Sequence, residues 1–203
     1  MSSEKPLLVD EIPSPIGRIV IAARDGRLCA LEFGRARVAR QMIARYGRAR
    51  LLRSRDPFGF SARIRAYLAG DLAAVDDIPV ETGGTEFQRR VWRALRRIPP
   101  GRTLSYGALA RSLGRGAAAR AVGAANGRNP VSIVVPCHRL IGGDASLTGY
   151  GGGLWRKRWL LRHESAAGAP STLPAARPAG GRRRGRSRSP RRRRAGRRSA
   201  SRP

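Results

Sequence analysis

Residues 131–139 read Val131-Ser132-Ile133-Val134-Val135-Pro136-Cys137-His138-Arg139. The first five are rich in β-branched side chains, which predicts a buried strand. Pro136 lacks an N–H and would end such a strand. We therefore expect Cys137 at the strand end, directly after a backbone position that the proline ring makes rigid. A cysteine beside an apolar run is often only a small structural hydrophobe. It becomes a nucleophile at neutral pH beside a base or a positive charge, and His138 and Arg139 are the candidates by position.

Further motifs stand in register on both sides of this stretch. They are Ser105-Tyr106-Gly107, Ala119-Arg120-Ala121-Val122-Gly123, Asn129-Pro130, Thr148-Gly149-Tyr150 and Trp159-Leu160-Leu161-Arg162-His163-Glu164. In this order and spacing the chain closely resembles the O6-alkylguanine-DNA alkyltransferases, also called methylated-DNA–protein-cysteine methyltransferases. The close match covers about residues 85–164, and a looser match covers residues 7–84.

The resemblance implies a reaction that each molecule performs once. An alkyl group would pass from guanine O6, and also from thymine O4, to Cys137 without any cofactor. By similarity, His138 takes the thiol proton through a water and Glu164 orients that histidine. Tyr106 would donate to guanine N3, and Asn129 would hold backbone segments of the site together. The partner implied is double-stranded DNA that contains O6-alkylguanine.

Residues 105–126 have a helix-turn-helix pattern, with Ser105 as the N-cap of its first helix. The resemblance implies that the second helix enters the minor groove and that Arg120 fills the space of an extruded base, which the reaction needs because O6 is inaccessible inside a duplex. The DNA-binding residues expected besides Arg120 are Ser105 and the small residues Ala119, Ala121 and Gly123, which would permit close approach. Without the resemblance, an alanine-rich helix with one arginine is simply a good helix former packed on a neighbour.

A glycine-rich loop at residues 148–153 lacks the Lys-Ser/Thr of a phosphate loop, and the resemblance implies a lid over the extruded base. The residues expected to form the base pocket are Pro136, Leu140, Tyr150, Gly151 and Gly152.

The remaining elements follow from local patterns, and they predict an α/β (α+β) protein. Asp25-Gly26 between two apolar runs predicts a hairpin, and Thr85 with Gln88 predicts a capping box. Strands are expected at 17–22 and 28–33, and helices at 35–46, 61–68, 85–98, 106–113, 117–126 and 154–163, the last anchored by Trp155 and Trp159. Cys29 fits a strand interior.

These patterns divide the chain into three parts. Residues 1–82 are expected to be a support domain, for which the resemblance implies a ribonuclease-H-like fold without nuclease residues, and residues 79–84 to contain a linker. Residues 83–164 would be a winged helix-turn-helix-like domain that binds DNA and accepts the alkyl group. Residues 165–203 have almost no large apolar side chains and are expected to be a disordered, Arg-rich tail.

The composition limits the compartment and the partners. The net charge of +29 favours a polyanion as partner, although the excess of Arg over Lys is also compatible with a coding bias. No apolar run is long enough for a membrane span and no signal-peptide pattern is present, so we expect a cytoplasmic monomer. Two scattered Cys and two His lack any metal-ligand spacing, and we expect neither a metal site nor a disulfide.

Three other classes of function are compatible with parts of the sequence. A lesion-binding module that transfers nothing would lack the cysteine that this chain retains. A Cys-His hydrolase would need an oxyanion hole that the sequence does not indicate. A nucleic-acid coating protein would depend on the tail, which could equally be a solvated extension without a fixed role, or translated sequence beyond an ancestral stop codon.

Deleting residues 165–203 should weaken binding to undamaged DNA and flatten its salt dependence, because the tail carries thirteen arginines and no acidic residue. Titrations of both proteins with duplex DNA at several salt concentrations measure the slope. The truncated protein should react with free alkylated base as before, and an unchanged slope would show that the tail makes no phosphate contacts.

Overall fold

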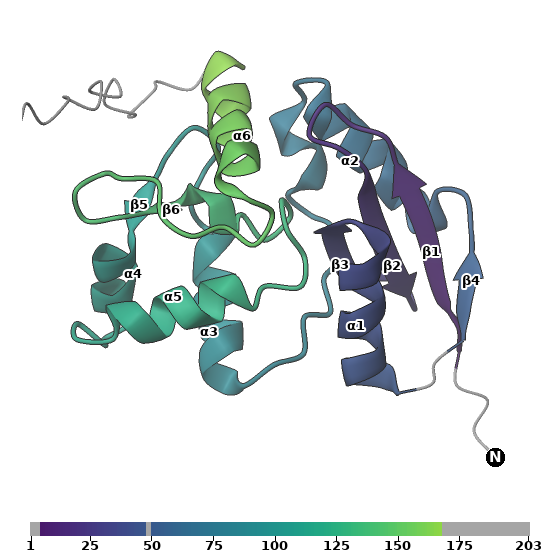
Figure 1. Cartoon of the computed structure of the whole chain (residues 1–203), viewed down its shortest axis with the longest axis horizontal. Coiled ribbons are helices and arrows are strands. Elements are labelled where there is room, and N and C mark those ends of the chain that lie inside the picture. Colours follow the sequence, from purple (N-terminus) through teal and green to yellow (C-terminus); the bar gives the residue numbers. More distant parts are fainter. Residues whose placement is uncertain (1–4, 48–49, 168–203) are drawn as a thin grey trace, which may run out of the picture. The chain divides into compact units, whose positions relative to one another are not determined.

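In the computed structural model, which describes residues 5–47 and 50–167, a four-stranded sheet organises the N-terminal half (Figure 1). Its strands are β1 (Leu7–Ile12), β2 (Ile19–Arg24), β3 (Arg27–Phe33) and β4 (Leu51–Arg53), in the spatial order β3-β2-β1-β4. β2 is antiparallel to β1 and β3, whereas β4 is parallel to β1. Asp25 and Gly26 have φ values of 50° and 69°, as a two-residue type I′ turn requires. The predicted hairpin is confirmed.

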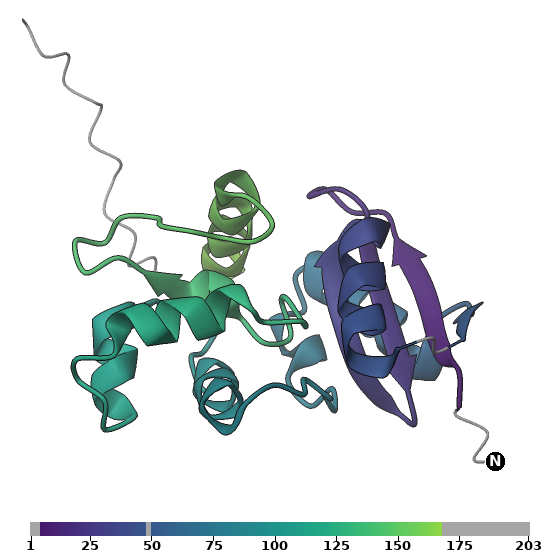
Figure 2. The same ribbon diagram turned by 60° about the horizontal axis from the view of Figure 1, so that its bottom comes forward.

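The two faces of this sheet are covered by two helices, α1 (Arg35–Tyr46) and α2 (Phe60–Leu68) (Figure 2). Side chains alternate along a strand, so neighbouring residues of β2 join different clusters. Val20 and Ala22 of β2 pack with Val38 and Met42 of α1. Ile19 and Ile21 belong to the larger cluster that contains Ile64 and Tyr67 of α2. Both helices agree with the predicted ranges to within one residue.

The C-terminal half is mostly helical. Its elements are α3 (Glu86–Leu95), β5 (Leu104–Ser105), α4 (Tyr106–Ser112), α5 (Ala119–Gly127), β6 (Leu140–Ile141) and α6 (Leu154–Ala166), with β5 parallel to β6. Thr85 and Gln88 form the predicted capping box at the start of α3, and the Ser105 hydroxyl accepts the N–H of Ala108 at the start of α4. α5 packs against both α3 and α4, and the Trp92 indole donates to the carbonyl of Ala125 at 3.0 Å.

The strand predicted at residues 131–135 is wrong. Only Val131 forms a bridge, to Leu31 of β3, and the chain then makes two tight turns. The N–H of Val134 bonds to the carbonyl of Ser132, around Ile133 with φ at +72°. The N–H of Cys137 bonds to the carbonyl of Val135, around Pro136 with φ −79° and ψ 68°, an inverse γ-turn.

Positive φ is costly for a β-branched residue such as Ile133, and strained backbone of this kind persists only where the surrounding packing enforces it. Here Ile133 is buried in the large cluster. Cys137 consequently begins a short 3-10 turn, Cys137–Arg139, and does not lie at a strand end as predicted.

The prediction that Trp155 anchors α6 by packing in the interior is also wrong, since Trp155 is 49% exposed. The buried face of α6 carries Lys157, Leu160, Leu161 and Glu164, at the i, i+3, i+4, i+7 spacing of one helix stripe. Trp159 is partly buried and stacks on His163, with ring centroids 4.8 Å apart. The buried stripe of α6 therefore carries two charged residues.

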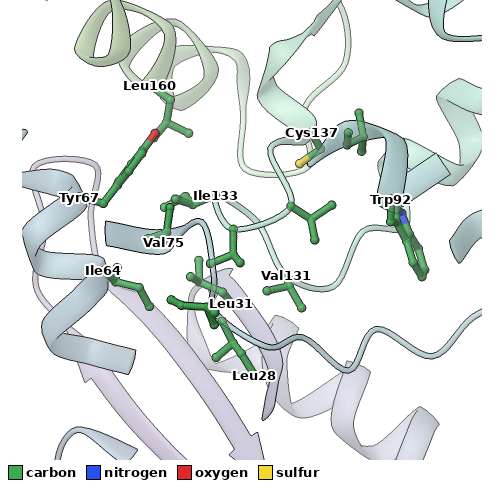
Figure 3. Close-up of a cluster of buried hydrophobic side chains, with 14 of the residues drawn as sticks. Leu28, Leu31, Ile64, Tyr67, Val75, Trp92, Val131, Ile133, Cys137 and Leu160 are labelled. Atoms are coloured by element: carbon green, nitrogen blue, oxygen red, sulfur yellow. The ribbon is translucent and has the colours of Figure 1, made fainter. Parts of the chain in front are cut away.

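One hydrophobic cluster joins both halves of the chain. Figure 3 shows Leu28 and Leu31 of β3 near Val131 and Ile133, with Tyr67 reaching towards Leu160 of α6. Backbone bonds support this packing, because the N–H of Leu31 bonds to the carbonyl of Pro130 at 3.0 Å. Part of the predicted linker is paired as well, since Val80 forms a bridge to Leu28.

The predicted tail lies outside the described residues, apart from residues 165–167, the first two of which continue α6. Among residues 5–47 and 50–167, no helix has the length and apolar character needed to cross a membrane.

Candidate active site

Cys137 is buried, with 5% of its surface exposed, and it lines a cavity of about 420 Å³. The cavity is bounded by Arg37, Tyr106, Gly123, Asn126, Gly127, Asn129, Ser132, Cys137, Thr148, Gly149, Tyr150 and Gly151. Two buried polar atoms on its wall, the Tyr150 hydroxyl oxygen and Asn126 Oδ1, have no hydrogen-bond partner among the described residues. Buried polar groups are normally paired, so this cavity suits a ligand that carries both donors and acceptors.

The resting form of Cys137 is the neutral thiol. Burial raises its pKa to about 11, although hydrogen bonds from Asn129 and Ser132 act in the opposite direction. The nearby Glu32 carboxylate raises the pKa further, and the Lys157 ammonium lowers it. The thiol therefore needs a base if it is to attack at neutral pH.

His138 is fully buried and bonds through Nε2 to Glu164 Oε1 at 2.8 Å. Burial alone would raise the pKa of Glu164, but hydrogen bonds from His138 and Arg139 and the positive charge of Arg139 hold it well below its usual range, so the carboxylate is ionised and only accepts. Nε2 must then carry the proton and Nδ1 keeps its lone pair. Burial lowers the pKa of His138. Nδ1 is buried, has no partner in the described part of the chain, and can accept a proton.

Arg139 pairs with Glu164 and does not activate the thiol. Its Nη2 lies 2.8 Å from Glu164 Oε1, its Nε lies 3.1 Å from Oε2, and Nη1 bonds to the carbonyl of Ile98. The backbone N–H of Gly101 also donates to Oε2, at 3.2 Å. Position in the sequence made Arg139 a candidate neighbour of Cys137, but the 3-10 turn directs it towards α6.

Lys157 is a site residue that the sequence did not reveal. It is buried, and its ammonium donates to the carbonyls of Leu140 and Thr148, which fixes the start of the glycine-rich loop. Burial lowers its pKa to about 8. A lysine three residues before Leu160, on the apolar stripe of a helix, is the signal that could have identified it.

The glycine-rich loop is held by two arginines. Arg37 of α1 donates to the carbonyl of Gly151 at 2.9 Å, and Arg156 of α6 donates to the carbonyl of Gly152 at 2.7 Å. A Cβ on either glycine would collide with a neighbour, the Arg37 guanidinium at Gly151 and the ring of Phe33 at Gly152. The Arg37 guanidinium ends a flexible side chain and can move aside, whereas the rings at Gly152 cannot do so easily, so glycine is required most clearly at position 152.

The structure brings together six of the predicted site residues around one cavity, namely Cys137, Asn129, Tyr106, Tyr150, Gly151 and Gly123 of α5. His138 and Glu164 pair outside its lining. Three predicted pocket residues are not part of the lining, namely Pro136, Leu140 and Gly152. The predicted DNA contacts Arg120 and Ala121 are exposed on α5, with Ala119 and the cap residue Ser105 half-buried.

A larger cavity of about 620 Å³ is lined by residues of α1, β1 and β4 and contains no Cys or His. It lacks a nucleophile, so we assign the site to the smaller cavity. Among the described residues no cluster of three His, Cys, Asp or Glu side chains could hold a metal ion.

Two family models match the chain. Residues 10–82 match the ribonuclease-like domain, and residues 86–166 the DNA binding domain, of 6-O-methylguanine DNA methyltransferase. The chain belongs to the 6-O-methylguanine DNA methyltransferase family. The suspected family and the expected ribonuclease-like and DNA-binding halves are confirmed.

Known members of this family align over most of the chain. A methylated-DNA–protein-cysteine methyltransferase of Shigella flexneri is 49% identical over 163 residues, which cover 78% of this chain and 95% of the relative. One from Mycolicibacterium paratuberculosis is 47% identical, over 77% of this chain and 93% of its own. The crystal structure of Mycobacterium tuberculosis OGT in complex with DNA has a TM-score of 0.68 at 40% identity, over 80% of this chain and 96% of that one.

Replacing Glu164 by Gln should lower the free energy of unfolding by about 3–5 kcal/mol, because Arg139 is then buried without a counter-charge. The unmodified protein should lose stability as the pH falls below about 4.5, since the folded-state pKa of Glu164 is lowered and the unfolded chain takes up the proton first. Urea unfolding at neutral pH and at acidic pH measures both effects.

Glu86→Gln is the matched control, since Glu86 is exposed in the first turn of α3. It should change stability little. If Glu164→Gln unfolded at the same urea concentration and with the same pH dependence as the unmodified protein, the buried ion pair would not have the structural role described.

Proposed function

We propose that the protein repairs alkylated DNA by moving the alkyl group from guanine O6, and also from thymine O4, onto Sγ of Cys137. The observation that carries this proposal is a buried thiol on the wall of a cavity, followed directly by a histidine that an ionised, buried carboxylate orients. Relatives named methylated-DNA–protein-cysteine methyltransferases support it. No feature of the site or of these names favours a lesion-binding module without transfer.

The chemical step is a displacement at carbon. The sulfur–carbon bond forms as the carbon–O6 bond breaks, and the electron pair of that bond stays with guanine. The thiol proton passes through a water to Nδ1 of His138, and the departing guanine anion takes up one proton from water, so that a proton replaces the alkyl group. The imidazolium of His138 then returns its proton to solvent. Burial raises the pKa of Tyr106, so its hydroxyl stays protonated and can donate to guanine N3.

The raised pKa of Cys137 makes the histidine necessary. With a pKa of about 11, ionising this thiol at neutral pH costs roughly 5 kcal/mol, so proton removal must accompany attack. Asn129 holds the geometry, since its Nδ2 donates to the carbonyl of Val135 at 2.8 Å and its Oδ1 accepts the N–H of Val131 at 3.0 Å. The thioether product has no route back to the thiol, so each molecule acts once.

DNA would bind along α5. Its exposed surface is made of small residues around Arg120, and Gly123 of the same helix lines the cavity. A duplex hides guanine O6, so the base must leave the stack to reach Sγ, and Arg120 would occupy the space that it leaves. The unpaired polar atoms of Asn126 and Tyr150 suit the polar edges of such a base.

The matches at residues 10–82 and 86–166 support a division of the chain into a support domain, 1–82, a DNA-binding and alkyl-acceptor domain, 83–164, and a tail, 165–203. We infer that one molecule acts alone, in the cytoplasm and without a membrane partner.

Cys137→Ser should abolish transfer of a labelled methyl group from O6-methylguanine in duplex DNA and leave lesion binding intact, because a hydroxyl is a poor nucleophile here but fits the same space. Mass spectrometry of the unmodified protein should place one methyl group on the peptide that contains Cys137. Cys29→Ser removes the other buried thiol and should react normally. A methyl group on Cys29 would refute the assignment.

Arg120→Ala should slow repair of duplex DNA more than reaction with free O6-benzylguanine, because only the duplex requires a base to be extruded. The loss should correspond to a few kcal/mol at most, about the energy of unstacking one base. Single-turnover rates on both substrates provide the comparison. Arg162→Ala, which removes an equal charge from an exposed position on α6, is the control. Equal losses on both substrates would exclude the intercalating role.

A further inference from the structure

One tyrosine of the N-terminal half bonds directly to the carboxylate that orients His138. Tyr67 of α2 is fully buried, and its hydroxyl donates to Glu164 Oε1 at 2.7 Å. The two residues lie 97 positions apart in the sequence. Figure 3 shows the Tyr67 hydroxyl pointing to α6 beside Leu160. Burial raises the pKa of Tyr67, so the hydroxyl keeps its proton and remains a donor.

Tyr67 and His138 share the same carboxylate oxygen. Oε1 of Glu164 accepts from the Tyr67 hydroxyl at 2.7 Å, from His138 Nε2 at 2.8 Å and from Arg139 Nη2 at 2.8 Å. Each donor withdraws negative charge from that oxygen and restricts where the carboxylate can turn. A change at Tyr67 therefore acts on the bond that orients the imidazole.

The position of Tyr67 is fixed by its own surroundings. Its ring meets the edge of the His163 ring at 5.4 Å, and its carbonyl bonds to His163 Nε2 at 2.7 Å. The ring also belongs to the large cluster that contains Ile64 and Leu160. Because α2 rests on the sheet, the sheet and its helix set where the hydroxyl meets Glu164.

We propose that Tyr67 is a positioning residue for alkyl transfer, which acts through Glu164 to hold His138 in the orientation that leaves Nδ1 free to accept the thiol proton. This inference rests on the proposed function of Cys137. It gives the N-terminal domain a specific part in the reaction, although that domain supplies no reacting atom.

The sign of the expected pH effect follows from the groups around the imidazole. The charged or titratable groups that act on His138 and Glu164 are Arg139, Lys157 and Tyr67, and Cys137 precedes His138 in the chain. Removing the Tyr67 hydroxyl leaves more negative charge on Glu164 for His138, which favours the imidazolium and raises the pKa of His138. Transfer requires neutral His138, so the acidic limb of the rate profile should move to higher pH.

The test compares Tyr67→Phe with Tyr46→Phe in the full chain. Tyr46 also donates from the N-terminal half to a carboxylate, that of Glu81, and it contacts no group of the site. With O6-methylguanine duplex in a single turnover, Tyr67→Phe should slow transfer about tenfold, as expected for a hydrogen bond to a charged group. Its acidic limb should move upwards, and Tyr46→Phe should match the unmodified protein in both respects.

Replacing Tyr67 by 3-fluorotyrosine keeps the shape of the side chain if Tyr67→Phe does not fold. The more acidic hydroxyl is a stronger donor, so the acidic limb should move to lower pH. An unmoved pH profile in these variants would overturn the inference, even if the rate or the melting temperature fell, because a purely structural role predicts that result. Failure of the unmodified protein to take up one methyl group per molecule would instead refute the proposed function.

Discussion

A carboxylate that is buried away from water needs hydrogen-bond donors around it to stay ionised. Glu164, which is fully buried, is such a carboxylate. Burial alone would raise its pKa, yet His138, Arg139, Tyr67 and the Gly101 N–H together keep it ionised. These donors come from a 3-10 turn, from α2 and from the segment after α3. The carboxylate therefore fixes three distant parts of the chain around α6, and losing one donor would leave charge unsatisfied in the interior.

Burial also explains why the Cys137 thiol is unreactive in the absence of substrate. A cysteine reacts with oxidants and stray electrophiles as its thiolate, and a pKa of about 11 keeps that form scarce at neutral pH. A protein that can react only once has reason to protect its thiol in this way. His138 is neutral and can accept the thiol proton only at Nδ1. The reactivity of Cys137 therefore depends on the geometry between the thiol and Nδ1, because the sulfur is not a thiolate beforehand.

Elements governed by neighbouring residues could be predicted from the sequence, and those governed by distant contacts could not. The Asp25-Gly26 hairpin and the Thr85 capping box depend on local geometry and are confirmed. Residues 131–135 have the composition of a strand, but packing forces Ile133 to positive φ, and a single bridge replaces the ladder. The prediction placed Trp155 on the buried face of α6, which Lys157 occupies, because a tryptophan is usually more buried than a lysine.

The site residues that lie in short sequence motifs could be predicted, and those that the N-terminal half contributes could not. Cys137, Asn129 and Tyr106 stand in short motifs, whereas Arg37 meets Gly151 across 114 residues. Arg37 also lies 3.1 Å from Glu32, the buried carboxylate whose charge disfavours the thiolate. Burial raises the pKa of Glu32 and the charge of Arg37 lowers it, so the arginine that holds the glycine-rich loop also acts on the charge state of a carboxylate near Cys137. A support domain that supplies no reacting atom can thus influence the chemistry through hydrogen bonds and charge alone.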